Sequence, residues 1–261
     1  KGWQMHLFRF VLTTILAFTV LTSGVVQAQQ GQRQPAQQPP QGFLYGVGIG
    51  INQEIYRGYK RRTIPLPLVG YRGEKLSVYG PFVSYQLLQQ GNFSVSAKLA
   101  PRFAGFDESD SNVFSGMAKR KSSLDGGIAV QFRQQSWLFE AETVVDLLGN
   151  SKGQESKLAV GYNVRFGPLL LEPKLGVSYA DSNLVDYYYG VRLNEATAER
   201  MAYRAGSAVN YNAGLSLSNP LLGGMARLGV EHHWYDSSIS DSPLTDRDSG
   251  VSAFLSWSRF F

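Results

Sequence analysis

Apolar and polar residues alternate along several segments of the chain, most clearly in three consecutive ones. In WLFEAETVVDL (137–147), the odd-numbered positions are apolar or threonine, whereas Glu140, Glu142 and Asp146 share the even-numbered face. The same alternation runs through KLAVGYNVRF (157–166) and LLLEPKLGVSY (169–179). Successive side chains of a strand point to opposite faces, so each segment predicts a β-strand with one apolar and one polar face.

These segments have the length of membrane-spanning strands. A tilted strand needs ~9–11 residues to cross a bilayer. A charged face does not suit the core of a soluble sandwich, while an apolar face with aromatic residues near its ends is typical of lipid-facing girdles. We therefore expect an all-β protein, a transmembrane antiparallel up-and-down β-barrel with a polar lumen. The inverse arrangement, a soluble barrel with the apolar face inside, leaves the export signal and the aromatic C-terminal strand unexplained.

Connection lengths predict the strand number. The connections between the predicted strands are alternately short and long. The short ones are at 73–74, 89–92, 134–136, 167–168 and 219–224, and the long ones are at 53–63, 107–121, 148–156, 181–202 and 236–247. Bacterial single-chain barrels have even strand numbers, short periplasmic turns and longer external loops. A direct count of the segments yields an odd number. Folding 74–88 into a short hairpin bent at Gly80-Pro81 yields about 12 strands, with 10 as the alternative.

The last strand, SAFLSWSRFF (252–261), has one apolar face, on which Trp257 and Phe261 lie. Lipid is the natural cover for an apolar face at the end of a chain, so we interpret Trp257 and Phe261 as an assembly signal for the barrel assembly machinery. Arg259 occupies the position, three from the end, where such signals prefer an aromatic residue.

The N-terminal residues predict export. The uncharged apolar run after Arg9 is shorter than a membrane-spanning helix requires, and Val26-Gln27-Ala28 resembles a signal-peptidase site. We expect a cleaved signal peptide (1–28, its pattern starting at Met5), a disordered Gln/Pro tether (29–42) and an outer-membrane β-barrel (43–261).

Composition excludes several classes of function. The chain has 25 basic and 20 acidic residues, a balance that does not indicate nucleic-acid binding. It has no cysteine, which excludes thiol catalysis and disulfides. No cofactor motif is present, and the adjacent His232 and His233 face opposite sides of a strand, so they are a poor metal pair.

The lumen is predicted to be charged. By alternation, seven charged residues point inward: Lys98, Arg102, Glu140, Glu142, Arg165, Glu172 and Lys174. Unpaired charges are costly between low-dielectric walls, so these residues are expected to form ion pairs that stiffen the barrel. If water fills the lumen, the same residues would set the selectivity of a pore.

Two further groups are candidates for function. Tyr187, Tyr188 and Tyr189 lie in the long 181–202 loop, where large rings bearing hydroxyls suit either a plug in the lumen or a ligand surface. Glu231 and His233 are predicted to face inward beside Ser252 and Ser256, the minimum set for acyl transfer. No nucleophile motif accompanies them, and residues two apart on one strand do not naturally orient each other.

The sequence resembles a known family. TIPLPLVGYRGEKLSVYG (63–80), YYYGV (187–191), AYRAG (202–206) and the C-terminal strand are similar to the MltA-interacting protein (MipA/OmpV) family of outer-membrane proteins over residues 43–261. This resemblance implies an outer-membrane barrel of a Gram-negative cell envelope. It also implies a scaffold role for peptidoglycan enzymes, with a lytic transglycosylase and a murein synthase as partners; other members are described as porin-like, adhesive or stress-related.

The sequence therefore predicts a non-enzymatic protein of the cell outer membrane. A scaffold for murein enzymes is favoured through the resemblance, although short periplasmic turns offer little of the ~800 Å² per partner of a standard interface. A restricted small-solute channel is the alternative favoured by the polar lumen. A lipid-modifying outer-membrane enzyme is the less favoured third hypothesis.

Overall fold

The computed structural model describes residues 41–59 and 61–261, and its regular structure is mostly β-strand. The predicted signal peptide and nearly all of the predicted tether lie outside the described residues. No helix in the described ranges is long and apolar enough to cross a membrane. The strands are β1 (Gly42–Gln53), β2 (Arg61–Arg72), β3 (Leu76–Tyr79), β4 (Phe82–Gln90), β5 (Phe93–Arg102), β6 (Ser123–Gln134), β7 (Trp137–Asp146), β8 (Gln154–Tyr162), β9 (Val164–Phe166), β10 (Leu169–Ala180), β11 (Ala208–Leu221), β12 (Gly224–Trp234) and β13 (Ser249–Phe260).

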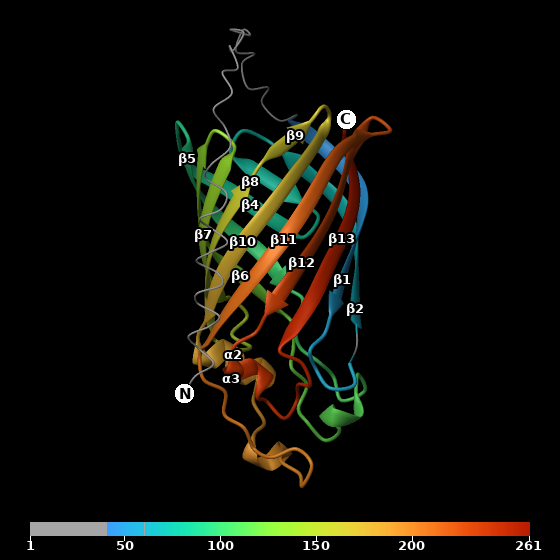
Figure 1. Cartoon of the computed structure of the whole chain (residues 1–261), viewed down its shortest axis with the longest axis vertical. Helices are drawn as coiled ribbons and strands as arrows, with labels where there is room; N and C mark the ends of the chain where they lie inside the picture. Colours follow the sequence, from blue (N-terminus) through green and yellow to red (C-terminus); the bar gives the residue numbers. More distant parts are fainter. Residues whose placement is uncertain (1–40, 60) are drawn as a thin grey trace, which may run out of the picture. The chain divides into compact units, whose positions relative to one another are not determined.

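The strands form one closed antiparallel barrel (Figure 1). Neighbours in the ring are neighbours in sequence, and β13 pairs with β1 to close it. β8 and β9 are two parts of one strand, because both pair with β10 on either side of Asn163. The labelled strands thus occupy twelve positions, which confirms the predicted twelve rather than ten. The hairpin bent at Gly80-Pro81 is present as β3 and β4.

The two ends of the barrel differ in their connections. The turns at 73–75, 91–92, 135–136, 167–168 and 222–223 are short and lie at the end where β1 begins and β13 finishes. Leu222 and Gly223 both have positive φ angles, 50° and 71°, as a two-residue type I′ hairpin requires. Short turns mark the periplasmic end of an outer-membrane barrel, so the long connections are extracellular.

Side chains alternate between the outside and the lumen as predicted. On β7, Trp137, Phe139 and Val145 point outward and are exposed, whereas Leu138 and Val144 point inward and are buried. The exposed outward residues form the apolar surface that faces lipid.

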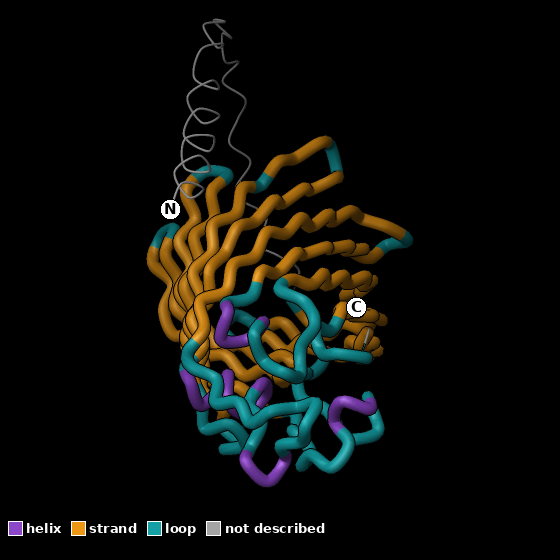
Figure 2. The backbone as a smooth tube through the Cα atoms, turned by 60° about the horizontal axis from the view of Figure 1, so that its bottom comes forward, coloured by secondary structure: helices purple, strands orange, loops and turns teal. Residues whose placement is uncertain are grey.

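Extracellular connections gather over one end of the barrel (Figure 2). They contain the α-helices α2 (Ser182–Tyr189) and α3 (Ser237–Ser240) and the 3-10 helices η2 (Asn112–Phe114) and η3 (Leu193–Glu195). Two hydrophobic clusters hold these loops together. The loops are therefore a packed head rather than a set of independent segments.

Candidate functional site

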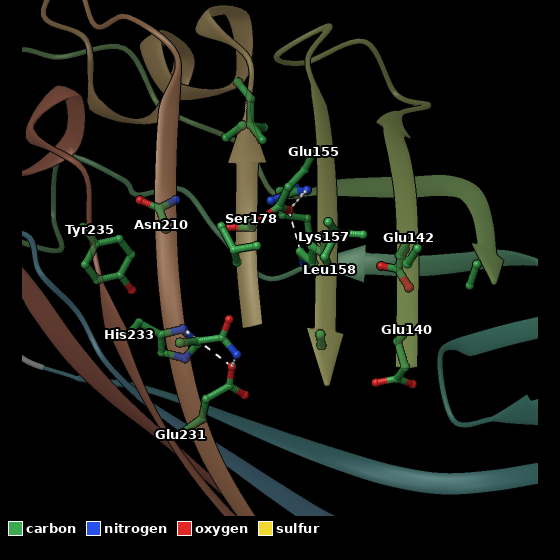
Figure 3. Close-up of a pocket in the computed structure, with 18 of the residues that line it drawn as sticks. Glu140, Glu142, Glu155, Lys157, Leu158, Ser178, Asn210, Glu231, His233 and Tyr235 are labelled. Atoms are coloured by element: carbon green, nitrogen blue, oxygen red, sulfur yellow. Dashed lines mark hydrogen bonds and ion pairs between the residues drawn. The ribbon is translucent and has the colours of Figure 1, made fainter. Parts of the chain in front are cut away.

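The lumen contains a polar cavity of ≈ 550 Å³ beneath the extracellular head (Figure 3). A second cavity of ≈ 280 Å³, nearer the periplasmic turns, shares Lys174 and Glu231 with the first. Together they form the candidate site. The polar side chains around the larger cavity are Lys98, Arg102, Gln131, Glu140, Glu142, Glu155, Lys157, Lys174, Ser178, Tyr188, Tyr189, Asn210, Asn212, Glu231, His233 and Tyr235.

Most of the predicted lumen charges lie in ion pairs along the wall. Lys98 of β5 pairs with Glu142 of β7, and Lys174 of β10 pairs with Glu140 of β7. Each pair reaches over one intervening strand, which ties alternate strands together.

A third group of charges lies closer to the extracellular mouth. Arg102 contacts Asp125 at 2.6 Å and Glu155 at 2.8 Å, and Lys157 lies 3.2 Å from Glu155. These contacts nearly balance the charge of the cavity. The arrangement fits the predicted stiffening network, and it leaves little net charge to select ions.

The periplasmic mouth is different, because arginines there lack acidic partners. Arg72, Arg133, Arg165 and Arg227 lie beside the short turns on the inward faces of β2, β6, β9 and β12. Among the described residues none of these four makes an ion pair, and neither does Glu172, which borders the smaller cavity. The mouth that faces the periplasm is therefore basic.

Helix α2 closes the extracellular mouth, and we call residues 181–207 the lid. Asp181 caps the helix, accepting a hydrogen bond from Leu184 N at 2.9 Å. The buried face of α2 packs on residues that end strands around the ring. This cluster contains Leu184, Val185 and Tyr188 of α2, Ile55 after β1, Ala180 of β10, Ala208 of β11 and Ile239 of α3.

The three lid tyrosines occupy two sides of the helix. Tyr188 and Tyr189 line the larger cavity, whereas Tyr187 lines a separate depression among the loops. Tyr188 donates to Lys121 O at 3.2 Å, its own carbonyl accepts from Tyr56 at 3.1 Å, and Tyr189 stacks on Tyr56. These contacts suit the predicted plug, which caps the lumen rather than filling it.

An ion pair buried in the head was missed by the sequence reasoning. Arg120 is 2% exposed and donates to both carboxylate oxygens of Glu195 at 2.9 and 2.7 Å. It also donates to the carbonyl of Tyr187. The pair joins segments 75 residues apart, and no local pattern of the sequence indicated it.

Of the four residues considered above as a minimum set for acyl transfer, the structure brings two together. His233 Nε2 lies 3.0 Å from Ser252 Oγ. Glu231 Oε1 is 3.8 Å from His233 Nδ1, beyond hydrogen-bonding distance, and accepts instead from Asn212. His233 and Ser252 both lie within regular strands. Their backbone N–H groups therefore take part in the hydrogen bonds between strands and do not form an oxyanion hole. The arrangement is an incomplete catalytic set.

The residues of the predicted assembly signal lie on the outer surface at the periplasmic end. Phe261 is within ring-contact distance of Phe43 and Tyr45, with centroids 6.1 and 5.8 Å apart. Trp257 contacts Tyr45 and donates its indole N–H to Leu221 O at 2.8 Å. The aromatic residues therefore form a belt where β13 meets β1.

Comparison with known proteins identifies the family that the sequence resembles, and the match covers nearly all of the barrel. Residues 45–261 match the family described as MltA-interacting protein MipA. The chain is 30% identical to the putative outer membrane protein YiaT of Escherichia coli K12 over 78% of this chain and 84% of YiaT. It is 29% identical to the outer membrane protein OmpV of Vibrio cholerae over 89% of this chain and 88% of OmpV.

Two further similarities are more distant. The chain is 25% identical to the MltA-interacting protein of Escherichia coli K12, over 78% of this chain and 84% of that protein. Among solved structures, an outer membrane channel from Pseudomonas putida F1 aligns with a TM-score of 0.40 at 10% identity, over 87% of this chain and 99% of the channel.

Proposed function

The chain belongs to the MltA-interacting protein MipA family of outer-membrane proteins, and from this premise we propose that it is an interaction protein that binds a periplasmic peptidoglycan enzyme. The observation that carries the proposal is the similarity of this chain, over 78% of its length, to a relative named for interaction with MltA. In this proposal the barrel anchors the complex in the outer membrane, and a lytic transglycosylase is the partner, with a murein synthase as a second one.

The basic periplasmic mouth is the described surface best suited to the partner. Arg133, Arg165 and Arg227 are exposed there, and none of them forms an ion pair with an acidic residue of the described ranges 41–59 and 61–261. The short turns alone offer little area, so a partner would add contacts with residues 29–42 or reach into the mouth. Charge complementarity raises association rates and selects partners, which favours an acidic partner surface.

A binding experiment tests this proposal. The full chain in nanodiscs is mixed with a soluble lytic transglycosylase, and binding is measured by interferometry at low and at physiological salt. The triple change Arg133→Gln, Arg165→Gln and Arg227→Gln is expected to weaken binding at least tenfold, because it removes the unpaired charges of the mouth.

The matched control is Arg57→Gln with Arg61→Gln, which removes exposed arginines at the extracellular end. This pair is expected to bind like the unchanged chain. Equal binding by the triple variant would reject the mouth as the docking surface. No binding by any form, including the unchanged chain, would reject the interaction itself.

A restricted small-solute channel is the second candidate, favoured by one observation. The two lumen cavities share Lys174 and Glu231 in their walls, so polar cavities follow one another from beneath the lid toward the periplasm. The packed lid opposes free conduction through this path. Single-channel recording, described in the Discussion, separates the two candidates.

A further inference from the structure

One edge of β2 lacks a neighbouring strand over most of its length. β2 pairs with β1 from Arg61 to Arg72, but it pairs with β3 only at Gly70–Arg72. β3 ends at Tyr79, where the chain turns back into β4. Within the described part of the chain, residues 61–68 therefore have a strand on one side only, and the wall between β2 and β5 is incomplete in its extracellular half.

Two prolines occupy this unpaired edge. Val69 O accepts a hydrogen bond from Gly80 N at 3.2 Å, so the odd-numbered residues of β2 direct their backbone groups toward the open side. Pro65 and Pro67 share that parity and have no N–H group. An unsatisfied N–H in hydrocarbon costs several kcal/mol, so the prolines remove two donors that lipid could not satisfy. They also discourage another strand from pairing there.

The unpaired edge lies at the depth of the lipid belt. Val69 beside it and Val47 on β1 point outward and are 72% and 67% exposed. Acyl chains are therefore the molecules that surround this edge. Arg61, exposed at the extracellular end of β2, stands where an anionic lipid headgroup would lie.

Behind this edge the lumen wall is apolar. Ile64, Leu66 and Leu68 point inward and pair with three glycines of β1 in register, Gly50, Gly48 and Gly46. This sector contrasts with the charged wall formed by β5, β7, β8 and β10.

Two inward-facing aromatic rings on strands near this sector are partly exposed. Phe82 of β4 pairs with the inward-facing Tyr79 and is 36% exposed, and Phe254 of β13 is 42% exposed. Phe254 lies over Gly229 on the inner face of β12. A lumen filled with water alone would leave these apolar surfaces hydrated, which is unfavourable.

We propose that the unpaired edge of β2 admits an acyl chain of an outer-leaflet lipid, which packs against Ile64, Leu66 and Phe254 while its anionic headgroup stays near Arg61. Gly48 and Gly50 of β1 leave this wall without side chains above Leu66 and Ile64, whereas a Cβ on Gly46 would clash with Trp257 O. A Cβ built on Gly48 or Gly50 meets its nearest neighbours only at 3.4 and 3.8 Å. The barrel thus has a lateral lipid-binding site, which meets the smaller lumen cavity at Phe254.

Photo-crosslinking tests this proposal. The full chain is reconstituted with an anionic phospholipid that carries a diazirine on its acyl chain, and the crosslinked residues are mapped by mass spectrometry. Crosslinks are expected at outward-facing residues such as Val69 and also at the inward-facing Leu66 and Phe254. Ala129, inward-facing on the charged wall, is expected to remain free of them.

A double variant that fills the proposed acyl-chain site provides a second test, in which the crosslinking at Val69 serves as the internal control. Gly48→Val with Gly50→Val places side chains in the space over β1 and is expected to reduce crosslinking at Leu66 at least fivefold, with Val69 unchanged. Crosslinks confined to outward-facing residues would overturn the proposal. Protein–protein crosslinks at Pro65 and Pro67 with no lipid at Leu66 would overturn it as well, because the edge would then belong to an interface between two copies.

Discussion

At the scale of single residues, the ion pair between Arg120 and Glu195 holds the extracellular head together. Burial raises the pKa of Glu195, but hydrogen bonds from Arg120 and from the backbone N–H groups of Arg192 and Ala118 outweigh burial and lower that pKa to about 2. The ordinary value is 4.5, so the folded head favours the ionised carboxylate.

Because the folded pKa is depressed, this stabilisation is complete above pH 4.5 and is lost as the pH falls toward 2. Breaking one side of a buried pair costs ~3–5 kcal/mol. Glu195→Gln is therefore expected to speed amide exchange in residues 181–207 by more than about a hundredfold at neutral pH and to abolish the acid-dependent loosening between pH 4.5 and 2. Hydrogen exchange, corrected for the intrinsic rate at each pH, measures both effects.

The control is Lys119→Ala, next in sequence to Arg120. Lys119 pairs with Asp107 at 3.2 Å, but both side chains are exposed. Exposed pairs are worth ~0–1 kcal/mol, so lid exchange is expected to change less than about fivefold. Equal effects of the two substitutions would contradict a special role for the buried pair.

At the scale of elements, β13 closes the barrel, and we predict that the aromatic end of the chain also acts as an assembly signal. It pairs with both β12 and β1, so its docking closes the ring. The residue that follows β13 adds a hydrogen bond from Phe261 N to Phe43 O at 3.1 Å and the aromatic contacts with β1. Yet the ring of Phe261 is 78% exposed, so its truncation removes little burial.

Phe261→Ala is therefore expected to slow assembly several-fold while changing the stability of the folded barrel by less than about 1 kcal/mol. The folded fraction is followed over time by the heat-dependent mobility of the barrel in electrophoresis, with liposomes containing the assembly machinery. Phe139→Ala, which truncates an outward-facing aromatic residue of β7, serves as the control. A slowing as large for Phe139→Ala would show that any lipid-facing aromatic acts this way and that Phe261 carries no specific signal.

At the scale of the whole molecule, the lid and the lumen determine whether solutes pass. The lid packs on strand ends from several sides of the ring, so its release would uncover the ≈ 550 Å³ cavity. The proposed interaction role requires no passage through the barrel.

Planar-bilayer recording is the measurement at this scale. The full chain is expected to show no steady conductance, and a variant lacking residues 181–202 is expected to conduct, because the deletion removes α2 from the mouth. Tyr187→Phe, which retains the ring outside the cavity, is the control and is expected to stay silent. Steady conductance steps in the unchanged chain would favour the channel over the interaction protein.

Several features of this protein follow from its sequence alone, because alternate residues of a membrane-spanning strand face lipid and the lumen and therefore differ in polarity. The alternating pattern identified the outward faces of the strands and the inward-facing charged residues, such as Lys98 and Lys174. The even strand number of bacterial barrels predicted the hairpin at Gly80-Pro81. The resemblance in the PLPL and YYYGV segments identified the family. These signals are local, so each can be interpreted without knowing where the rest of the chain lies.

Tertiary structure alone decided which distant groups meet. The pairing of Arg120 with Glu195 and the 3.0 Å approach of His233 to Ser252 depend on how loops and strands close around the ring. The unpaired edge at Pro65 and Pro67 depends on where β3 stops relative to β2. Alternation specifies which face a side chain takes, but register and loop packing, set by many weak contacts far apart in sequence, determine its neighbours.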